Sequence, residues 1–156
     1  MKSDLEYSNL PKKRMGSGII LLNEHNEILL TKSPYKDYWT VPGGSVDENE
    51  SPRRACIREI KEEIGLDILD VRFMCVDYQN NSEKGESLQF LFYGGILTQQ
   101  QIHAITLQEE EISEYTFLPL LEAQKLLGKL LGIRIEKCLE AYKNNQALYL
   151  ENAEVH

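Results

Sequence analysis

The segment from Ser51 to Gly65, SPRRACIREIKEEIG, constrains the fold more than any other part of the sequence. Ser51 is suited to cap the N-terminus of a helix, and Pro52 fits its first helical position. Gly65 is a natural residue to end the helix in the left-handed conformation. The pattern therefore predicts a helix from about Pro52 to Ile64.

The two sides of this predicted helix differ in chemistry. At 100° per residue, one side is apolar and should pack against a sheet; it is formed by Ile57, Ile60 and Ile64. The opposite side carries Glu59, Glu62 and Glu63. Like charges at these spacings repel by roughly 0.2–0.5 kcal/mol a pair. A solvated acidic face is the ordinary explanation, and a site for a hard cation such as Mg²⁺ or Mn²⁺ is the alternative, because these ions prefer oxygen ligands.

The remaining pattern predicts a sheet with helices packed on it. Apolar runs at residues 18–22 and 28–31 flank the polar NEHNE and indicate a β-hairpin. Further strands are expected at 68–79, 86–97 and 115–118, the first two joined by the turn NNSEKG, and amphipathic helices at 120–127 and 133–142. Because strands and helices do not alternate strictly and no G-x-G-x-x-G occurs, we expect a mixed-sheet α/β or α+β sandwich instead of a doubly wound fold.

Bulk properties limit the classes of function. The 156 residues fit one domain, here taken as residues 1–156 with 1–14 as a polar tail or an extra N-terminal segment. The net charge of −8 argues against binding of duplex nucleic acid, which requires a basic surface. It is compatible with a phosphate substrate, because a metal held by carboxylates supplies positive charge locally. A homodimer does not follow from the sequence.

The cysteines and the hydropathy indicate the compartment. Cys56, Cys75 and Cys138 are odd in number and form no Cys-x-x-Cys pair, so we expect reduced thiols packed as small apolar groups. The sequence has no apolar run of signal-peptide or membrane-spanning length. We therefore expect a soluble cytoplasmic protein without a membrane partner.

Residues 44–66 resemble the signature of the Nudix hydrolases, the MutT-type pyrophosphohydrolases. The family's box is Gly, five residues, Glu, seven residues, Arg-Glu, an aliphatic, any residue, Glu-Glu, any residue, Gly and an aliphatic. Every spacing is intact, and the matching residues are Gly44, Glu50, Arg58, Glu59, Ile60, Glu62, Glu63, Gly65 and Leu66. Asn49 stands where glycine is common, and asparagine tolerates a left-handed turn.

The resemblance extends over roughly residues 15–130, because WTVPGG precedes the box and EEISEYTFLPLLEA follows it in the family's manner. It implies the family's α/β/α sandwich. It also implies that three glutamates hold one or more Mg²⁺ ions, with Mn²⁺ as the alternative: Glu59, Glu62 and Glu63. The carbonyl of Gly43 or Gly44 would be a further ligand.

The resemblance also implies roles for residues other than the three glutamates. Arg58 would orient carboxylates, above all Glu50, through a bidentate pair. A glutamate outside the box often serves as an extra ligand or general base, and the spacing to Phe117 favours Glu111, with Glu109 and Glu110 as alternatives. Lys32 would contact a phosphate.

The implied activity is Mg²⁺-dependent hydrolysis of the pyrophosphate bond in a nucleoside diphosphate linked to X. Depending on the group X, the substrate would be a nucleoside triphosphate, a nucleotide sugar or an ADP-ribose type compound. One alternative is a catalytically silent Nudix domain that binds a nucleotide and regulates a partner, although such a domain is expected to have lost box carboxylates. Another is an isomerase on the same scaffold, which calls for an active-site cysteine and extra segments. The sequence leaves X and the base open.

Overall fold

The computed structural model describes residues 4–80 and 83–156, so residues 81 and 82 of the predicted NNSEKG turn and residues 1–3 of the predicted tail lie outside it. The strands are β1 (Arg14–Leu22), β2 (Ile28–Lys32), β3 (Trp39–Thr40), β4 (Gly43–Ser45), β5 (Arg72–Gln79), β6 (Ser87–Ile96), β7 (Glu114–Leu118), β8 (Leu148–Glu151) and β9 (Glu154–Val155). The helices are α1 (Asp4–Ser8), α2 (Pro52–Ile64), α3 (Gln99–His103), α4 (Leu120–Leu126) and α5 (Lys129–Lys143).

Within the described residues the strands form one mixed sheet in the order β3-β2-β1-β6-β5-β8-β9, with β4 paired to β1 and β7 to β2. β1 runs parallel to β6 along its whole length, and β5 is antiparallel to β6. Within the described residues β1 pairs with β2 only at Leu22 and Ile28, so the two strands diverge. β4 pairs with β1 at Gly16, Ser17 and Gly18.

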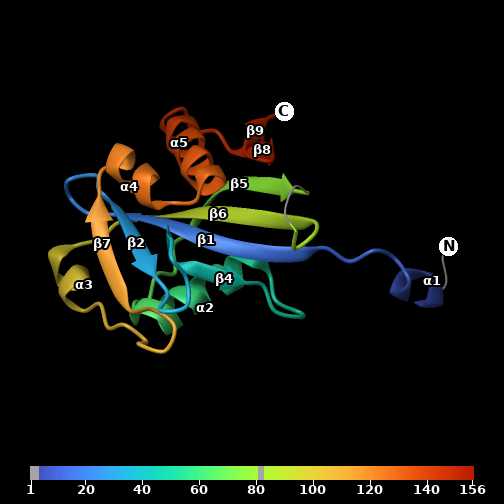
Figure 1. Cartoon of the computed structure of the whole chain (residues 1–156), viewed down its shortest axis with the longest axis horizontal. Coiled ribbons are helices and arrows are strands. Elements are labelled where there is room, and N and C mark those ends of the chain that lie inside the picture. The colour runs from blue at the N-terminus through green and yellow to red at the C-terminus, as the bar shows by residue number, and fades with distance from the viewer. Residues whose placement is uncertain (1–3, 81–82) are drawn as a thin grey trace.

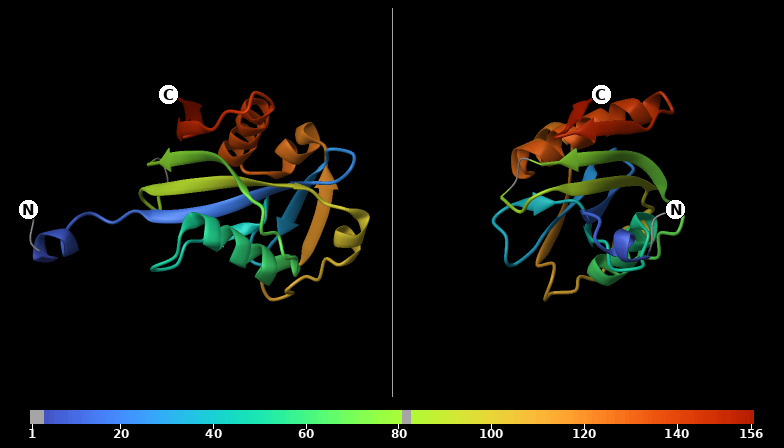
Figure 2. Two further views of the ribbon diagram at one scale, coloured as in Figure 1. Left: turned by 180° about the vertical axis from the view of Figure 1, so that it is seen from behind. Right: turned by 90° about the vertical axis from the view of Figure 1, so that its right-hand side faces the viewer.

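Helices cover both faces of this sheet, with α2 on one side and α4 and α5 on the other (Figures 1 and 2). The side chains of β1 alternate between two apolar clusters: Ile20 and Leu22 pack under α4 and α5, and Ile19 and Leu21 pack against α2. Burying each such side chain stabilises the fold by roughly 1.5–3 kcal/mol. The expected mixed-sheet α/β/α sandwich is therefore confirmed.

The helix predicted at Pro52–Ile64 is present with both of its predicted ends. The Ser51 side chain accepts a hydrogen bond from the Arg54 amide at 3.2 Å. Gly65 has a φ of 75°, in the left-handed region that ends the helix. Asn49 has a φ of 61°, so this asparagine does occupy the conformation expected at the family's glycine position.

Several boundaries differ from the sequence-based prediction. Strand β5 begins at Arg72 instead of residue 68, because residues 68–71 form an irregular segment whose Ile68 and Val71 are nevertheless buried. α5 begins at Lys129, ahead of the expected residue 133. Six short elements were not predicted, since each has too few residues for a periodic pattern: α1, α3, β3, β4, β8 and β9.

The three cysteines are free and buried, as predicted for packed thiols. Burial raises the pKa of the Cys56 thiol to about 12. In the described part of the chain, no helix has the length and apolar character that crossing a bilayer requires. α1 stands apart from the sheet at the N-terminal end (Figure 1).

Candidate functional site

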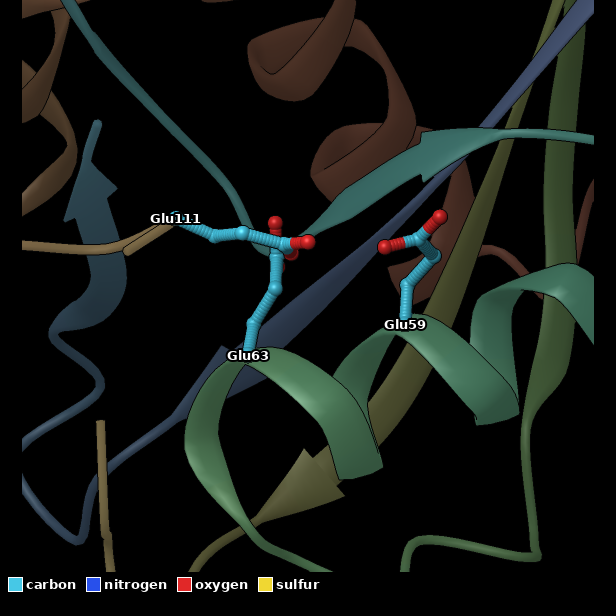
Figure 3. Close-up of side chains that lie close together, drawn as sticks. All are labelled: Glu59, Glu63 and Glu111. Atoms are coloured by element: carbon cyan, nitrogen blue, oxygen red, sulfur yellow. The ribbon is translucent and has the colours of Figure 1, made fainter. Parts of the chain in front are cut away.

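Three carboxylates meet beside β4. Glu59 and Glu63 lie one turn apart on α2, and Glu111 lies in the loop between α3 and β7 (Figure 3). One oxygen of each lies within 4.8 Å of the others. The structure therefore brings together two of the three box glutamates and, among the three candidates outside the box, Glu111.

The C-terminal end of α2 explains why Glu111 lies beside Glu59 and Glu63. The last carbonyls of a helix have no partner within the helix. Here the Thr106 amide donates to the Ile64 carbonyl at 3.0 Å, and the Gln108 amide donates to the Glu63 carbonyl at 3.1 Å. The Glu111 amide then donates to the Gln108 carbonyl at 2.9 Å. The contacts that complete α2 thus also carry the loop to the carboxylates.

Arg58 connects the remaining acidic residues of the box. Its Nε donates to Glu50 Oε1 at 2.8 Å and its Nη2 to Glu50 Oε2 at 3.0 Å, which is the bidentate arrangement expected for this pair. Its Nη1 donates to Glu59 and to Glu62, both at 3.0 Å. The bidentate contact with Arg58 lowers the pKa of Glu50 to about 2 and raises that of Arg58.

Glu62 lies outside the three-carboxylate cluster. Its side chain is 46% exposed and pairs with Arg58, one turn back on α2. The helical wheel places Glu62 on the same side of α2 as Glu59 and Glu63. A wheel describes only the helix itself, whereas the surrounding fold covers Glu63 and leaves Glu62 exposed to solvent. The metal-ligand role of Glu62 stays a prediction.

Glu63 is the most buried of the three clustered carboxylates, with 7% of the residue exposed. Its pKa is raised to about 8, mainly by burial and further by the charges of Glu59 and Glu111, although the Gly43 amide and the charge of Lys36 act to lower it. Burial likewise raises the pKa of Glu59. Within the described residues no ion pair joins Glu63 or Glu111 to a basic side chain.

Gly43 and Gly44 let the backbone approach these carboxylates. The Gly43 amide donates to Glu63 Oε2 at 2.9 Å. Gly43 has a φ of +152°, and a Cβ there would lie 2.3 Å from the Ser17 carbonyl oxygen. A Cβ on Gly44 would lie 2.3 Å from Glu59 Oε1. Larger residues would therefore displace the strand or the carboxylate, whereas the role of either glycine carbonyl as a ligand stays a prediction.

A cavity of about 400 Å³ adjoins Gly43 and Gly44 on the α5 side of the sheet. It forms because the β1 positions that face α5 change from Ile20 to Gly18 and Gly16, which leave no side chains to fill the space. Its apolar lining includes Val41, Leu91 and Leu131, and its polar lining includes Arg14, Lys36, Gln89 and Arg134. The size is within the range of pockets for small ligands.

Lys36, rather than Lys32, lines this cavity. Lys32 is the last residue of β2, and its Nζ lies 6.0 Å from the centre of the Trp39 ring. Lys36 follows in the loop before β3, where its charge acts on Glu63. The sequence signal for Lys36 was its place in SPYKDYWTVPGG, directly ahead of the Gly-Gly pair.

A buried ion pair that the sequence analysis missed also borders the cavity. Arg134 on α5 contacts Asp77 Oδ2 on β5 through Nε at 2.8 Å and through Nη2 at 2.7 Å. Asp77 Oδ1 accepts a hydrogen bond from the Ala153 amide at 3.0 Å. The signal for Arg134 was a lone arginine among apolar residues of the predicted second amphipathic helix.

The fold and the site together define an α/β/α sandwich with a carboxylate cluster at one helix and a ligand-sized cavity beside it. The model of the NUDIX domain family matches residues 12–136. The chain therefore belongs to the Nudix family, as its box indicates.

Curated relatives match through a shorter region. An RNA pyrophosphohydrolase of Hydrogenovibrio crunogenus is 44% identical over 61 residues, which is 39% of this chain and 37% of that protein. An 8-oxo-dGTP diphosphatase of Proteus vulgaris is 36% identical over 61 residues, 36% of this chain and 54% of that protein. The chain thus spans only 37% and 54% of the lengths of these two relatives.

Solved structures match over most of the chain. A MutT protein from Methanosarcina mazei has a TM-score of 0.68 and 21% identity, covering 88% of this chain and 100% of that one. The NUDIX domain of Shewanella oneidensis NrtR, complexed with ADP ribose, has a TM-score of 0.70 and 19% identity, covering 93% and 100%. At these identities the likeness concerns the fold.

Proposed function

We propose that the protein is a Mg²⁺-dependent hydrolase, with Mn²⁺ as the alternative ion, that splits the pyrophosphate bond of a nucleoside diphosphate linked to X. The observation that carries this proposal is the convergence of Glu59, Glu63 and Glu111 beside a cavity of ligand size. Family membership supports it, and so do the pyrophosphohydrolase and diphosphatase names of the matched relatives.

The three carboxylates fit a hard divalent cation. Their donor atoms are all oxygens, Glu63 is buried, and no described basic side chain pairs with Glu63 or Glu111. Glu59, Glu63 and Glu111 would hold the ion, with a carbonyl of Gly43 or Gly44 as a further donor. When bound, a divalent cation neutralises phosphate charge and lowers the pKa of a coordinated water.

The chain's own residues would divide the remaining work. Arg58 fixes Glu50 and Glu59 through its hydrogen bonds, so that Glu59 keeps one orientation. Lys36 would add positive charge for the diphosphate at the cavity wall. Glu111, the exposed member of the cluster, would accept the proton of the water that attacks phosphorus, after which the bridging P–O bond breaks. A role for Glu62 would act through Arg58.

The substrate would be a small nucleotide, because the cavity is of that size and the net charge of −8 disfavours duplex nucleic acid. One structural neighbour is described as a complex with ADP ribose. Three free, buried cysteines suit a reducing compartment, so we extend the proposal to a single-domain cytoplasmic enzyme.

The test is release of phosphate, pyrophosphate or a nucleoside monophosphate from a panel of nucleoside triphosphates, 8-oxo-dGTP, nucleotide sugars and ADP-ribose with Mg²⁺. We expect turnover of at least one class and a loss of about 100-fold or more in Glu59→Gln, because even the outer-shell partners of metal ligands contribute about 10–100-fold. Glu110→Gln is the matched control, because Glu110 is a neighbouring exposed acid outside the cluster. Nucleotide binding without turnover across the panel would instead support the silent regulatory alternative.

A further inference from the structure

Arg134 is a buried arginine that lines the cavity without being fully used by the protein. Only 8% of its side chain is exposed. The Nε and Nη2 of Arg134 contact the Asp77 carboxylate, which neutralises the guanidinium charge. Within the described residues, no acceptor pairs with Nη1 of Arg134. A guanidinium has five N–H donors and no acceptor. Arg134 therefore keeps donors for a ligand while its charge is already balanced.

Gln89 adds an acceptor to the same cavity. Its Nε2 donates to Ser87 Oγ at 3.0 Å, and its Oε1 lies over Gly16, where a Cβ would come within 2.3 Å of it. Within the described part of the chain no donor is recorded for this Oε1. The absence of a side chain at Gly16 thus gives the Gln89 amide group the space that it occupies.

The remaining walls suit a flat ring. Val41, Leu91 and Leu131 supply apolar surface. Gly16 and Gly18 add no side chains of their own, so the Gln89 oxygen lies over Gly16, and Val41 and Leu91 lie over Gly18. Gly43 and Gly44 belong both to this lining and to the surroundings of the carboxylate cluster. A base in the cavity would therefore lie close enough to the cluster for its own diphosphate to reach it.

The donor and acceptor pattern distinguishes between bases. Arginine pairs best with guanine through O6 and N7, two adjacent acceptors, whereas adenine carries an amino donor in place of O6. A glutamine oxygen can accept from the ring N1–H that 6-oxopurines carry. A phosphate is less suited to Arg134, because Asp77 already neutralises the guanidinium.

We propose that Arg134 and Gln89 are specificity-determining residues and that the cavity selects a 6-oxopurine base, of the guanine or hypoxanthine type, over adenine. The inference rests on the proposed function, because it assigns the base of the nucleotide that this site would hydrolyse. It uses Asp77 as a positioning residue that holds the Arg134 guanidinium against the wall.

The sharpest test compares inosine and adenosine triphosphates, which differ at the purine by the 6-oxo or 6-amino group and the N1 proton. We expect kcat/KM to be higher for the inosine compound by about tenfold or more, the discrimination of one good arginine contact. The same comparison with inosine and adenosine monophosphates, measured by calorimetry, gives a binding ratio that does not depend on turnover.

The variant Asp77→Asn/Arg134→Gln removes both charges together and keeps the oxygen that accepts from Ala153, so no buried charge is left alone. We expect its inosine-to-adenosine ratio to fall toward one, while Arg53→Gln, on the exposed surface of α2, keeps the wild-type ratio. If the double variant does not fold, Gln89→Ala serves instead, because it breaks no ion pair, and it should reduce the ratio by about threefold or more, in keeping with the loss of one neutral hydrogen bond.

Two outcomes would overturn the inference: equal or better use of the adenosine compounds by the wild type, or an unchanged ratio in the double variant and in Gln89→Ala. If no nucleotide in the panel is hydrolysed, the proposed function fails. The calorimetric ratio for the monophosphates then still decides the base preference.

Discussion

The protein buries two carboxylates in opposite ways. Asp77 has no exposed surface and meets the guanidinium of Arg134, whereas Glu63 is 7% exposed and meets a backbone amide and two other acids. Burying a charge without a partner is costly. The fold therefore neutralises Asp77 by itself, whereas it gives Glu63 no basic partner within the described residues, in keeping with the proposed cation at that site. A buried carboxylate without a basic partner, such as Glu63, therefore indicates a metal site better than a buried carboxylate in an ion pair, such as Asp77.

The largest loss of stability in this comparison should come from removing Arg134, the basic member of the Asp77–Arg134 pair. Arg134→Ala leaves the charge of Asp77 buried and unpaired, and we expect a loss of about 3–5 kcal/mol in the free energy of unfolding, with or without Mg²⁺. Urea denaturation measures it. Arg54→Ala is the control, because Arg54 is exposed and its side chain makes no hydrogen bond or ion pair within the described residues, and it should change stability by no more than about 0.5 kcal/mol. A loss below 1 kcal/mol for Arg134→Ala would mean that the pair does not hold α5 to β5.

The uncompensated acid should instead make the metal-free protein sensitive to pH. Folding raises the pKa of Glu63 from 4.5 to about 8, so its contribution to stability is complete below pH 4.5 and is lost as the pH rises through 8. In EDTA the free energy of unfolding should fall by about 3–5 kcal/mol over this range, because one pKa unit corresponds to about 1.4 kcal/mol. The lowered pKa of Glu50, about 2, acts in the opposite sense and at lower pH.

Denaturation at several pH values, in EDTA and in Mg²⁺, tests this expectation. We expect Glu63→Gln to remove most of the slope in EDTA, with the remainder coming from the raised pKa of Glu59, and also to reduce the stabilisation by Mg²⁺. Glu110→Gln should keep both, because Glu110 lies outside the cluster. The same slope in wild type and Glu63→Gln would contradict the assignment of this pH dependence to Glu63.

The smallest effect should come from the exposed cation nearest to Glu63. Lys36→Gln removes a charge at the cavity wall, and since exposed charges contribute about 1 kcal/mol or less, we expect KM to rise by no more than about fivefold with kcat unchanged. Raising the salt concentration should reduce the difference. Lys32→Gln is the matched control, and a larger effect there would restore the phosphate contact predicted from the sequence.

Local signals explain what the sequence could predict. The ends of α2 and its isoleucine stripe depend on neighbouring residues, so its range and caps followed from the sequence. The spacing to Phe117 favoured Glu111 without deciding between it and Glu109 or Glu110. The fold brings Glu111 to Glu59 and Glu63 because it fixes the loop to the end of α2. The choice between Lys32 and Lys36 depends on the path of the loop through Pro34, which no periodic pattern describes.

Distant pairings explain what the sequence could not predict. Asp77 and Arg134 are 57 positions apart and meet only because α5 crosses β5. The cavity depends on which face of β1 receives Gly16 and Gly18, and therefore on the register with β4 and β6. Strand β8 is too short to show a pattern, and it forms because β5 offers it an unpaired edge.

The alternation along β1 also bears on how such a protein can diversify. Residues 16, 17 and 18 all border the cavity, but only Gly16 and Gly18 face α5, because the Ser17 hydroxyl points to α2 and donates to the Pro52 carbonyl at 2.6 Å. Substitutions at even positions would thus reshape ligand preference and leave the support of the carboxylates intact. A shift of one residue would exchange the two faces and ruin both. Point substitutions on the cavity face of β1 would therefore change the ligand specificity. An insertion within β1 would instead disrupt both faces of the strand.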